Sequence, residues 1–238
     1  MSKELEFIWD LDSYSETIKP RLEEIAKRYG SHIIRRDTPI DNGIYFDRDG
    51  DEGIYVKLNK GVETPLKILY RNVVERKNAN FSYNLYLDEN SPQIDLLTDL
   101  LFIEHAYDFV RNYFEKNPEK LKDIATRLKG SDNILYLDNF VLERVGDARH
   151  YALTLGAILE YAMSKGILKN VKKVSIDSNA AYRPVSENQK EHVLDHVWCR
   201  LEIDRRKPLV LDPYFNYLGP VDVPVKTKNW DYRRPDEK

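Results

Sequence analysis

Hydrophobic positions near the N-terminus repeat with the spacing of a helix. The apolar series over residues 14–29 follows the capping-box pattern Ser13-x-x-Glu16 and stops at Gly30. Pro20 lies inside this stretch, where its ring fits either a later helix start or a kink. We therefore expect a helix over most of these residues.

The next stretch has the period of a strand instead. Between residues 32 and 87, short runs such as 53–58 and 81–86 alternate apolar with polar positions and stand between turn residues. This pattern predicts a strand-rich segment. Together with the preceding helix it forms an N-terminal α/β extension over residues 1–90.

Longer elements follow along the rest of the chain. Ser91 and Pro92 suit the N-cap and first turn of a long helix that runs on to Phe114. Helical spacing and alternation then predict helices over 121–128 and 147–165 and strands over 134–137, 171–176, 193–203 and 209–212. These elements predict an α+β fold with a helix packed on an antiparallel sheet, a core over residues 91–225 and a loosely docked polar tail over 226–238.

Composition narrows the range of functions. The chain has 238 residues, of which 42% are hydrophobic, and its charged side chains nearly cancel to a net charge of -3. It can therefore bury a substantial core, and no basic surface favours nucleic acid. No apolar run is long enough to span a membrane, and the N-terminus lacks the apolar segment of a secretion signal. The single cysteine, Cys199, fits a reducing compartment, so we expect a cytoplasmic protein; the sequence leaves the oligomeric state open.

The second half of the chain carries a more specific pattern. The run from Gly146 to Ala152 (G-D-A-R-H-Y-A) opens a predicted helix, and His-Val-Trp at 196–198 and Leu-Asp-Pro at 211–213 lie on predicted strands. This order resembles the transglutaminase-like branch of the papain-type cysteine hydrolases, where a Gly-x-Cys-Arg-x-Tyr-Ala helix start precedes a His-x-Trp strand and an Asp-Pro strand end. The resemblance covers residues 140–220 and implies a papain-like, transglutaminase-like core. Alanine stands at the nucleophile's place.

The resemblance implies a role for each of these residues. Position 148, here Ala148, would carry a nucleophilic thiol, because the first turn of a helix lowers the pKa of a thiol and raises its thiolate fraction. His196 would take the thiol proton and later protonate the leaving amine, while Asp212 would hold the required imidazole tautomer. Trp198 shares the strand parity of His196 and would shield the imidazole from water. Asn139 would complete an oxyanion hole with the backbone N–H of residue 148.

Three other side chains near these motifs have a plain structural interpretation. Cys199 lies three residues from His196 on one predicted strand, so the two side chains point to opposite faces and Cys199 is expected in the core. Arg149 and His150 lie off the apolar stripe of the helix. That position predicts solvent around Arg149 and a surface or supporting place for His150.

Two segments resemble metal-binding patterns. Aspartates alternate over 47–52 as in a calcium loop, but glutamate stands where that loop needs glycine, so we interpret the segment as a hairpin turn. Residues 192–196 resemble the His-x-x-Glu-His zinc pattern, which requires a helix, whereas they run into 197–203, which alternates as a strand. We expect neither a metal nor another cofactor.

The implied function is that of a cysteine hydrolase or acyltransferase. A Cys-His-Asp triad would act on peptide or side-chain amide bonds through a thioester, as in thiol proteases, deamidases, peptide glycanases and transglutaminases. Its partner would be a peptide or protein substrate. Ala148 has two explanations: an inactivated form of a chain whose natural residue is cysteine, or a natural pseudoenzyme that binds peptides without cleaving them. The completeness of the other triad positions favours the inactivated form.

Overall fold

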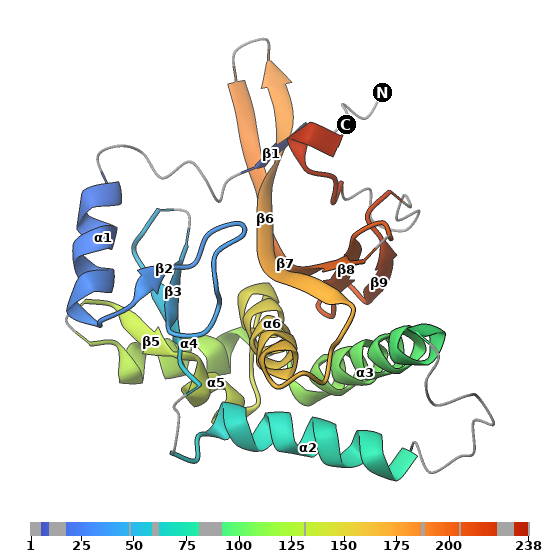
Figure 1. Ribbon diagram of the computed structural model, residues 1–238. Helices are drawn as coiled ribbons and strands as arrows, with labels where there is room; N and C mark the ends of the chain where they lie inside the picture. Colours follow the sequence, from blue (N-terminus) through green and yellow to red (C-terminus); the bar gives the residue numbers. More distant parts are fainter. Residues whose placement is uncertain are drawn as a thin grey trace.

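The computed structural model describes residues 6–9, 18–47, 49–58, 62–80, 92–130, 132–186, 189–204, 206–222 and 231–237. Over this part of the chain the protein has an α+β fold with six α-helices and two β-sheets, one antiparallel and one mixed (Figure 1). The predicted capping box at 13–16, the predicted strand at 81–86 and the predicted N-cap Ser91 lie outside the described residues.

The larger sheet is antiparallel, with its described strands in the order β1-β6-β7-β8-β9. They span Glu6–Trp9 (β1), Val171–Ser186 (β6), Gln189–Ile203 (β7), Leu209–Asp212 (β8) and Tyr217–Pro220 (β9). β6 and β7 form a long hairpin that pairs from Val171 opposite Ile203 to Ser186 opposite Gln189. The predicted antiparallel sheet is confirmed, and both hairpin strands run further than their apolar alternation indicated.

The second sheet is smaller and mixed, in the order β2-β3-β4-β5. Its strands span His32–Ile33 (β2), Gly43–Phe46 (β3), Gly53–Val56 (β4) and Ile134–Tyr136 (β5). β3 and β4 form an antiparallel hairpin. In its turn, Asp47 Oδ1 accepts hydrogen bonds from the backbone N–H groups of Asp51 at 2.8 Å and Glu52 at 3.2 Å, which confirms the predicted turn.

The described helices include four that match the predicted ones, with α1 beginning late, at the position that Pro20 allowed. The α-helices span Lys19–Arg28 (α1), Pro65–Asn80 (α2), Pro92–Tyr113 (α3), Pro118–Leu128 (α4), Leu137–Glu143 (α5) and Ala148–Ser164 (α6), and a short 3-10 helix spans Pro235–Glu237 (η1). α3, α4 and α6 lie where their apolar spacing predicts them, and Pro20 lies in the first turn of α1. None of these helices combines the length and the apolar composition needed to cross a lipid bilayer.

Helix α2 corrects the sequence interpretation. The strand-rich segment was expected to continue to residue 87, but residues 65–80 are helical. Pro65 occupies the first turn, Thr64 Oγ1 accepts a hydrogen bond from the N–H of Lys67 at 3.2 Å, and Asp138 Oδ1 accepts one from the N–H of Leu66 at 2.8 Å. These contacts satisfy N–H groups that a helix start leaves without intrahelical partners, and they outweigh the alternating pattern.

Helix α6 lies at the centre of the fold (Figure 1). It packs on β6 and β7 and also contacts α2, α3 and α5, and every residue from His150 to Leu159 is buried. Gly156 permits the closest approach, because a Cβ atom there would lie 2.6 Å from Ile40 Cδ1 and 2.9 Å from Ile176 Cδ1. The predicted packing of this helix on the antiparallel sheet is confirmed.

The two halves of the chain share one sheet and one apolar core. β5 pairs with β4, and the main core cluster runs from Ile34 in the N-terminal half to Leu211 in the C-terminal half. The described part of the polar tail is also tightly packed: Tyr232 is 2% exposed and Arg234 is 7% exposed. The expectation of a loosely docked tail is therefore wrong for residues 231–237, because they compensate charged groups buried in the sheet.

Asp99 on α3 provides a test of this packing. Its carboxylate is 1% exposed and accepts hydrogen bonds from the backbone N–H groups of Lys169 at 3.2 Å and Asn170 at 2.6 Å, and from the Asn170 side chain at 3.0 Å. Asp99→Ala leaves these donors without their acceptor, so we expect the free energy of unfolding in urea to fall by about 2–4 kcal/mol. Asp95→Ala removes an exposed ion pair with Lys169, which solvent screens, and should cost much less. Equal losses would contradict the role given to the buried carboxylate.

Candidate functional site

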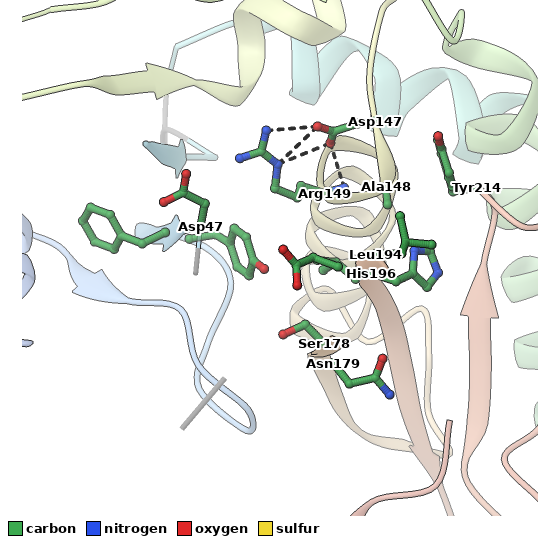
Figure 2. A pocket seen from close by; sticks show the side chains of 13 residues that line it. Asp47, Asp147, Ala148, Arg149, Ser178, Asn179, Leu194, His196 and Tyr214 are labelled. Atoms are coloured by element: carbon green, nitrogen blue, oxygen red, sulfur yellow. Dashed lines mark hydrogen bonds and ion pairs between the residues drawn. The ribbon is translucent and has the colours of Figure 1, made fainter. Parts of the chain in front are cut away.

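A pocket of about 340 Å³ opens where the start of α6 meets the β3–β4 hairpin and the long β6–β7 hairpin (Figure 2). Its volume lies in the range of sites that hold a small molecule or a few side chains of a larger partner. The residues that line it come from five places: Tyr45, Phe46 and Asp47 from β3 and its turn, Asp147, Ala148 and Arg149 from the start of α6, Ser178 and Asn179 from β6, Leu194, Asp195, His196 and Val197 from β7, and Tyr214 after β8.

The structure brings His196 and Asp212 into direct contact. His196 Nε2 lies 2.5 Å from Asp212 Oδ2, and the two residues are 1% and 0% exposed. This is the contact expected from their order along the chain. A carboxylate can only accept, so Nε2 carries the proton, and in the neutral ring Nδ1 carries the lone pair. The pair therefore presents a base of defined tautomer.

Two further groups hold the Asp212 carboxylate. The backbone N–H of Phe215 donates to Oδ1 at 2.9 Å, and the Tyr232 hydroxyl donates to Oδ2 at 2.6 Å. With His196 these donors occupy both carboxylate oxygens. A buried carboxylate needs such partners, because it has lost the hydration of its charge.

Aromatic rings enclose the His196 imidazole. The ring centroid of Phe215 lies 4.2 Å from that of His196, Trp198 stacks at 5.9 Å with an interplanar angle of 29°, and Tyr214 lies at 6.1 Å. Trp198 is fully buried and packs against the imidazole from outside the pocket lining. This arrangement agrees with a shielding role for Trp198, which stays a prediction.

Ala148 is the first residue of α6 and lines the same pocket as His196 (Figure 2). Asp147 is the N-cap of the helix and accepts a hydrogen bond from the backbone N–H of Arg149 at 2.9 Å. A side chain at position 148 therefore lies at the positive end of the helix dipole and lines the pocket that His196 also lines.

Arg149 differs from its sequence interpretation, and His150 takes the supporting place that was one of its two predicted positions. The Arg149 guanidinium lies 3.0 Å from Asp147 and 3.2 Å from Glu52, so it joins the helix start to the β3–β4 hairpin instead of pointing to solvent. His150 is 1% exposed, and its Nδ1 lies 2.8 Å from Asp147 Oδ1. Burial raises the pKa of Asp147, but His150 and Arg149 outweigh burial and hold that pKa well below its usual value. Asp147 thus remains a charged cap whose negative charge is neutralised locally.

Asn139 does not reach this pocket. It lies in α5, and it is not among the described residues that line the cavity. Its neighbour Asp138 caps the start of α2 instead. The predicted oxyanion role of Asn139 therefore has no support from its position.

Cys199 is buried in the core, as its strand parity predicts. Its side chain is 0% exposed and approaches Gly156 of α6, where an added Cβ atom would lie 3.8 Å from the sulfur. Burial raises the pKa of the Cys199 thiol, with Asp177 and Glu160 adding to the shift. A buried, protonated thiol is a poor nucleophile.

Among the residues that the structure describes, no group of three or more His, Cys, Asp or Glu side chains is placed so that it could hold a metal ion. The His-x-x-Asp-His run at 192–196 lies within the strand β7, so the zinc pattern lacks the helix it requires. Comparison of the chain with protein-family models, curated proteins and solved structures found no match. The functional interpretation therefore rests on the geometry of the pocket.

The sequence did not predict three aromatic residues beside the His–Asp pair: Tyr214, Phe215 and Tyr232. Phe215 follows Asp212-Pro213 within one turn, so its place could have been read from that turn. Tyr232 had no such signal, because its contact with Asp212 joins positions 20 residues apart through an aperiodic segment.

The burial of Cys199 predicts slow labelling. In the native chain we expect its reaction with a thiol reagent to be at least about a hundredfold slower than in denaturant, because labelling needs the core to open. The measurement is the rate of thiol modification with and without urea. Fast modification of the folded chain would contradict the packing of Cys199 against α6.

Asp147→Ala tests the helix start through its dependence on pH. We expect the variant to lose about 1–2 kcal/mol of unfolding free energy at neutral pH. Because the folded pKa of Asp147 lies below its unfolded value, this stabilisation is present above about pH 4 and is lost as the pH falls through the folded pKa. The difference between parent and variant, measured by urea unfolding at several pH values, should therefore shrink below about pH 4. Asp236→Ala removes an exposed carboxylate and is the matched control.

Proposed function

We propose that this pocket is the acyl-transfer site of a transglutaminase-like cysteine hydrolase in which position 148 is the place of the nucleophile. The chain with Ala148 would then bind an amide substrate without cleaving it. The observation that carries this proposal is the hydrogen-bonded pair of His196 and Asp212, which opens on the first residue of a helix across one pocket. The same arrangement of helix start, base strand and acid strand supports a papain-like core.

The chemistry follows from the positions of these groups. With cysteine at 148, His196 Nδ1 takes the thiol proton while Asp212 holds Nε2, and the sulfur attacks the carbonyl carbon of an amide. The imidazolium then gives its proton to the nitrogen of the leaving amine, the C–N bond breaks and a thioester remains. Water or a second amine, deprotonated by His196, attacks the thioester and the thiolate leaves. Hydrolysis and transamidation differ only in this last acceptor.

The oxyanion of the tetrahedral intermediate needs donors near position 148. The backbone N–H of Arg149 is taken by Asp147, so the N–H of residue 148 is the helix-start donor that we assign to the oxyanion. Arg149 pairs with both Asp147 and Glu52, so its guanidinium links the start of α6 to the β3–β4 hairpin that lines the pocket. The lone, buried Cys199 fits a reducing compartment, and we assign this activity to the cytoplasm.

A second candidate function is a peptide-binding module without catalysis. The observation that favours it is Ala148 itself, because a methyl group cannot attack a carbonyl. The chain would then hold a peptide in the pocket, against its aromatic lining residues Tyr45, Phe46 and Tyr214. Both candidates share the pocket, and they differ in what a thiol at position 148 would do.

Ala148→Cys tests the proposed function directly. We expect the introduced thiol to have a pKa about one to three units below the free-cysteine value, because the helix start and the nearby imidazole favour the thiolate. This pKa is read from how the rate of reaction with iodoacetamide depends on pH. The thiol should also release nitrophenolate from 4-nitrophenyl acetate as it is acylated. Adding His196→Ala should slow this acylation at least about a hundredfold by removing the general base. The rates are read from absorbance and from the mass of the modified chain.

A matched control separates the helix start from the base. Glu119→Cys places an exposed thiol in the first turn of α4, outside this pocket. If the thiol at position 148 titrates like this control and is insensitive to His196→Ala, position 148 is not a nucleophile site. Peptide binding to the Ala148 chain, with no acylation in Ala148→Cys, would favour the binding module.

A further inference from the structure

Residues 231–237, which we call the C-terminal strap, pack against the side chains that surround the His–Asp pair. Tyr232 of the strap lies edge-on to Trp198 with ring centroids 5.0 Å apart, and it stacks on Tyr217 at 5.1 Å with an interplanar angle of 6°. These rings belong to one apolar cluster, separate from the cluster around α6. Tyr232 therefore anchors the strap in the folded core on this face of the sheet.

The hydroxyl of Tyr232 reaches the carboxylate that holds His196. It donates to Asp212 Oδ2 at 2.6 Å, the oxygen that lies 2.5 Å from His196 Nε2. Burial and then the negative charge of Asp212 raise the pKa of Tyr232 above its usual value, so the phenol stays protonated at neutral pH. Tyr232 is thus a constant donor to the acid of the pair.

The two oxygens of Asp212 are fixed from opposite directions. The backbone N–H of Phe215 holds Oδ1 at 2.9 Å, and Tyr232 holds Oδ2. Rotation of the carboxylate about its Cβ–Cγ bond would break both hydrogen bonds. The Tyr232 hydroxyl therefore fixes where Oδ2 meets the imidazole.

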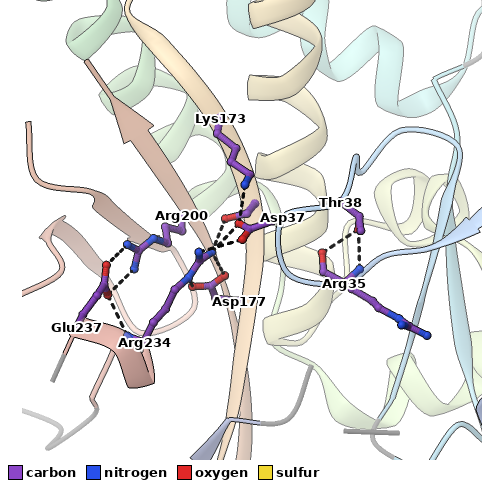
Figure 3. Close-up of polar contacts among 9 residues, drawn as sticks. Arg35, Asp37, Thr38, Lys173, Asp177, Arg200, Arg234 and Glu237 are labelled. Carbon is purple, nitrogen blue, oxygen red and sulfur yellow. Dashed lines mark hydrogen bonds and ion pairs between the residues drawn. The ribbon is translucent and has the colours of Figure 1, made fainter. Parts of the chain in front are cut away.

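A clamp of ion pairs, of which the pair between Arg234 and Asp177 is buried, holds the strap in place (Figure 3). Arg234 Nε and Nη2 donate to the two carboxylate oxygens of Asp177 at 2.9 and 2.8 Å, and its guanidinium also reaches Asp37 at 3.0 and 3.2 Å. Asp177 is 0% exposed. Removing Arg234 would leave that charge buried and unpaired, which is strongly unfavourable. The strap is therefore bound to the sheet by charge compensation two residues beyond Tyr232.

Contacts on either side of Tyr232 complete the clamp. Arg200 Nη1 donates to Glu237 Oε2 at 3.0 Å, and the same carboxylate accepts a hydrogen bond from the backbone N–H of Arg234 at 2.9 Å. Before Tyr232, Asn179 Nδ2 donates to the carbonyl of Asp231 at 3.0 Å. Asn179 is opposite His196 in the β6–β7 register, so this bond fixes the strap beside the base.

We propose that Tyr232 is a positioning residue of this site: its hydroxyl holds the Asp212 carboxylate in the orientation that fixes His196, and the ion pairs of the strap keep it there. The catalytic consequence rests on the proposed function. The hydrogen bond and its effect on His196 do not, so the two can fail separately.

The chain with Ala148 tests the positioning role without catalysis. The Nε2 proton of His196 should give a downfield proton NMR resonance in slow exchange with water, because it lies in a short charge-assisted hydrogen bond. The resonance is assigned by its loss in His196→Gln. Tyr232→Phe keeps the ring and removes only the hydroxyl. We expect exchange of this proton to quicken by about tenfold or more, the factor that corresponds to one hydrogen bond to a charged group.

Tyr217→Phe is the matched control. It removes the hydroxyl of the ring that stacks on Tyr232, but that hydroxyl donates to the carbonyl of Pro220 at 2.6 Å and not to Asp212. The His196 resonance should therefore stay as in the parent. An effect as large as that of Tyr232→Phe would assign the change to strap packing and overturn the proposal.

Acylation measures the catalytic consequence. In the Ala148→Cys background, Tyr232→Phe should lower the maximal rate of acylation by 4-nitrophenyl acetate about tenfold and leave the half-saturating concentration within about twofold, because Tyr232 does not line the pocket. An unchanged His196 resonance in Tyr232→Phe, or no slow-exchanging resonance in the parent, would overturn the positioning role even if Ala148→Cys is active. An inert thiol in Ala148→Cys would instead overturn the proposed function, and a resonance that depends on Tyr232 would still support the positioning of His196.

Discussion

The central helix α6 is buried on all sides, and the arrangement of the other elements follows from this burial. A helix with every residue from His150 to Leu159 buried must be enclosed by other elements, and β6, β7, α2, α3 and α5 supply that enclosure. Near its C-terminal end, Glu160 accepts hydrogen bonds from the backbone N–H groups of Ile40 and Asp41 at 3.0 and 2.7 Å, so the loop before β3 is tied to the same helix. With the helix held in this way, its first residue lines the pocket beside β7.

The second requirement is compensation of charges that the sheet buries. Asp177 and Asp212 are both 0% exposed, and a buried carboxylate is costly unless it is paired and hydrogen-bonded. The strap compensates both, with Arg234 at Asp177 and Tyr232 at Asp212. The packing of the strap and the geometry of the His–Asp pair are therefore parts of one network.

The N-terminal half contributes directly to the pocket. Tyr45, Phe46 and Asp47 of the β3–β4 hairpin form one wall, and Glu52 of the same hairpin pairs with Arg149 at the start of α6. The sequence of residues 1–90 resembles no known family that would predict a place for them beside the pocket. The wall exists because β4 pairs with β5, which fixes the hairpin against the C-terminal half.

Elements whose signals are local could be predicted from the sequence. Periodicity and turn residues act within a few positions, so they sufficed for α3, α4, α6 and the turn at Asp47, and strand parity sufficed for the burial of Cys199. The other features depend on contacts between residues far apart in the sequence. The start of α2 uses Asp138, which is 72 residues from its partner Leu66, and the place of Tyr232 on Asp212 depends on an ion pair between Arg234 and Asp177, which are 57 residues apart. Such contacts leave no periodic mark in the chain, because each joins a single charged or polar group to one partner far away in the sequence.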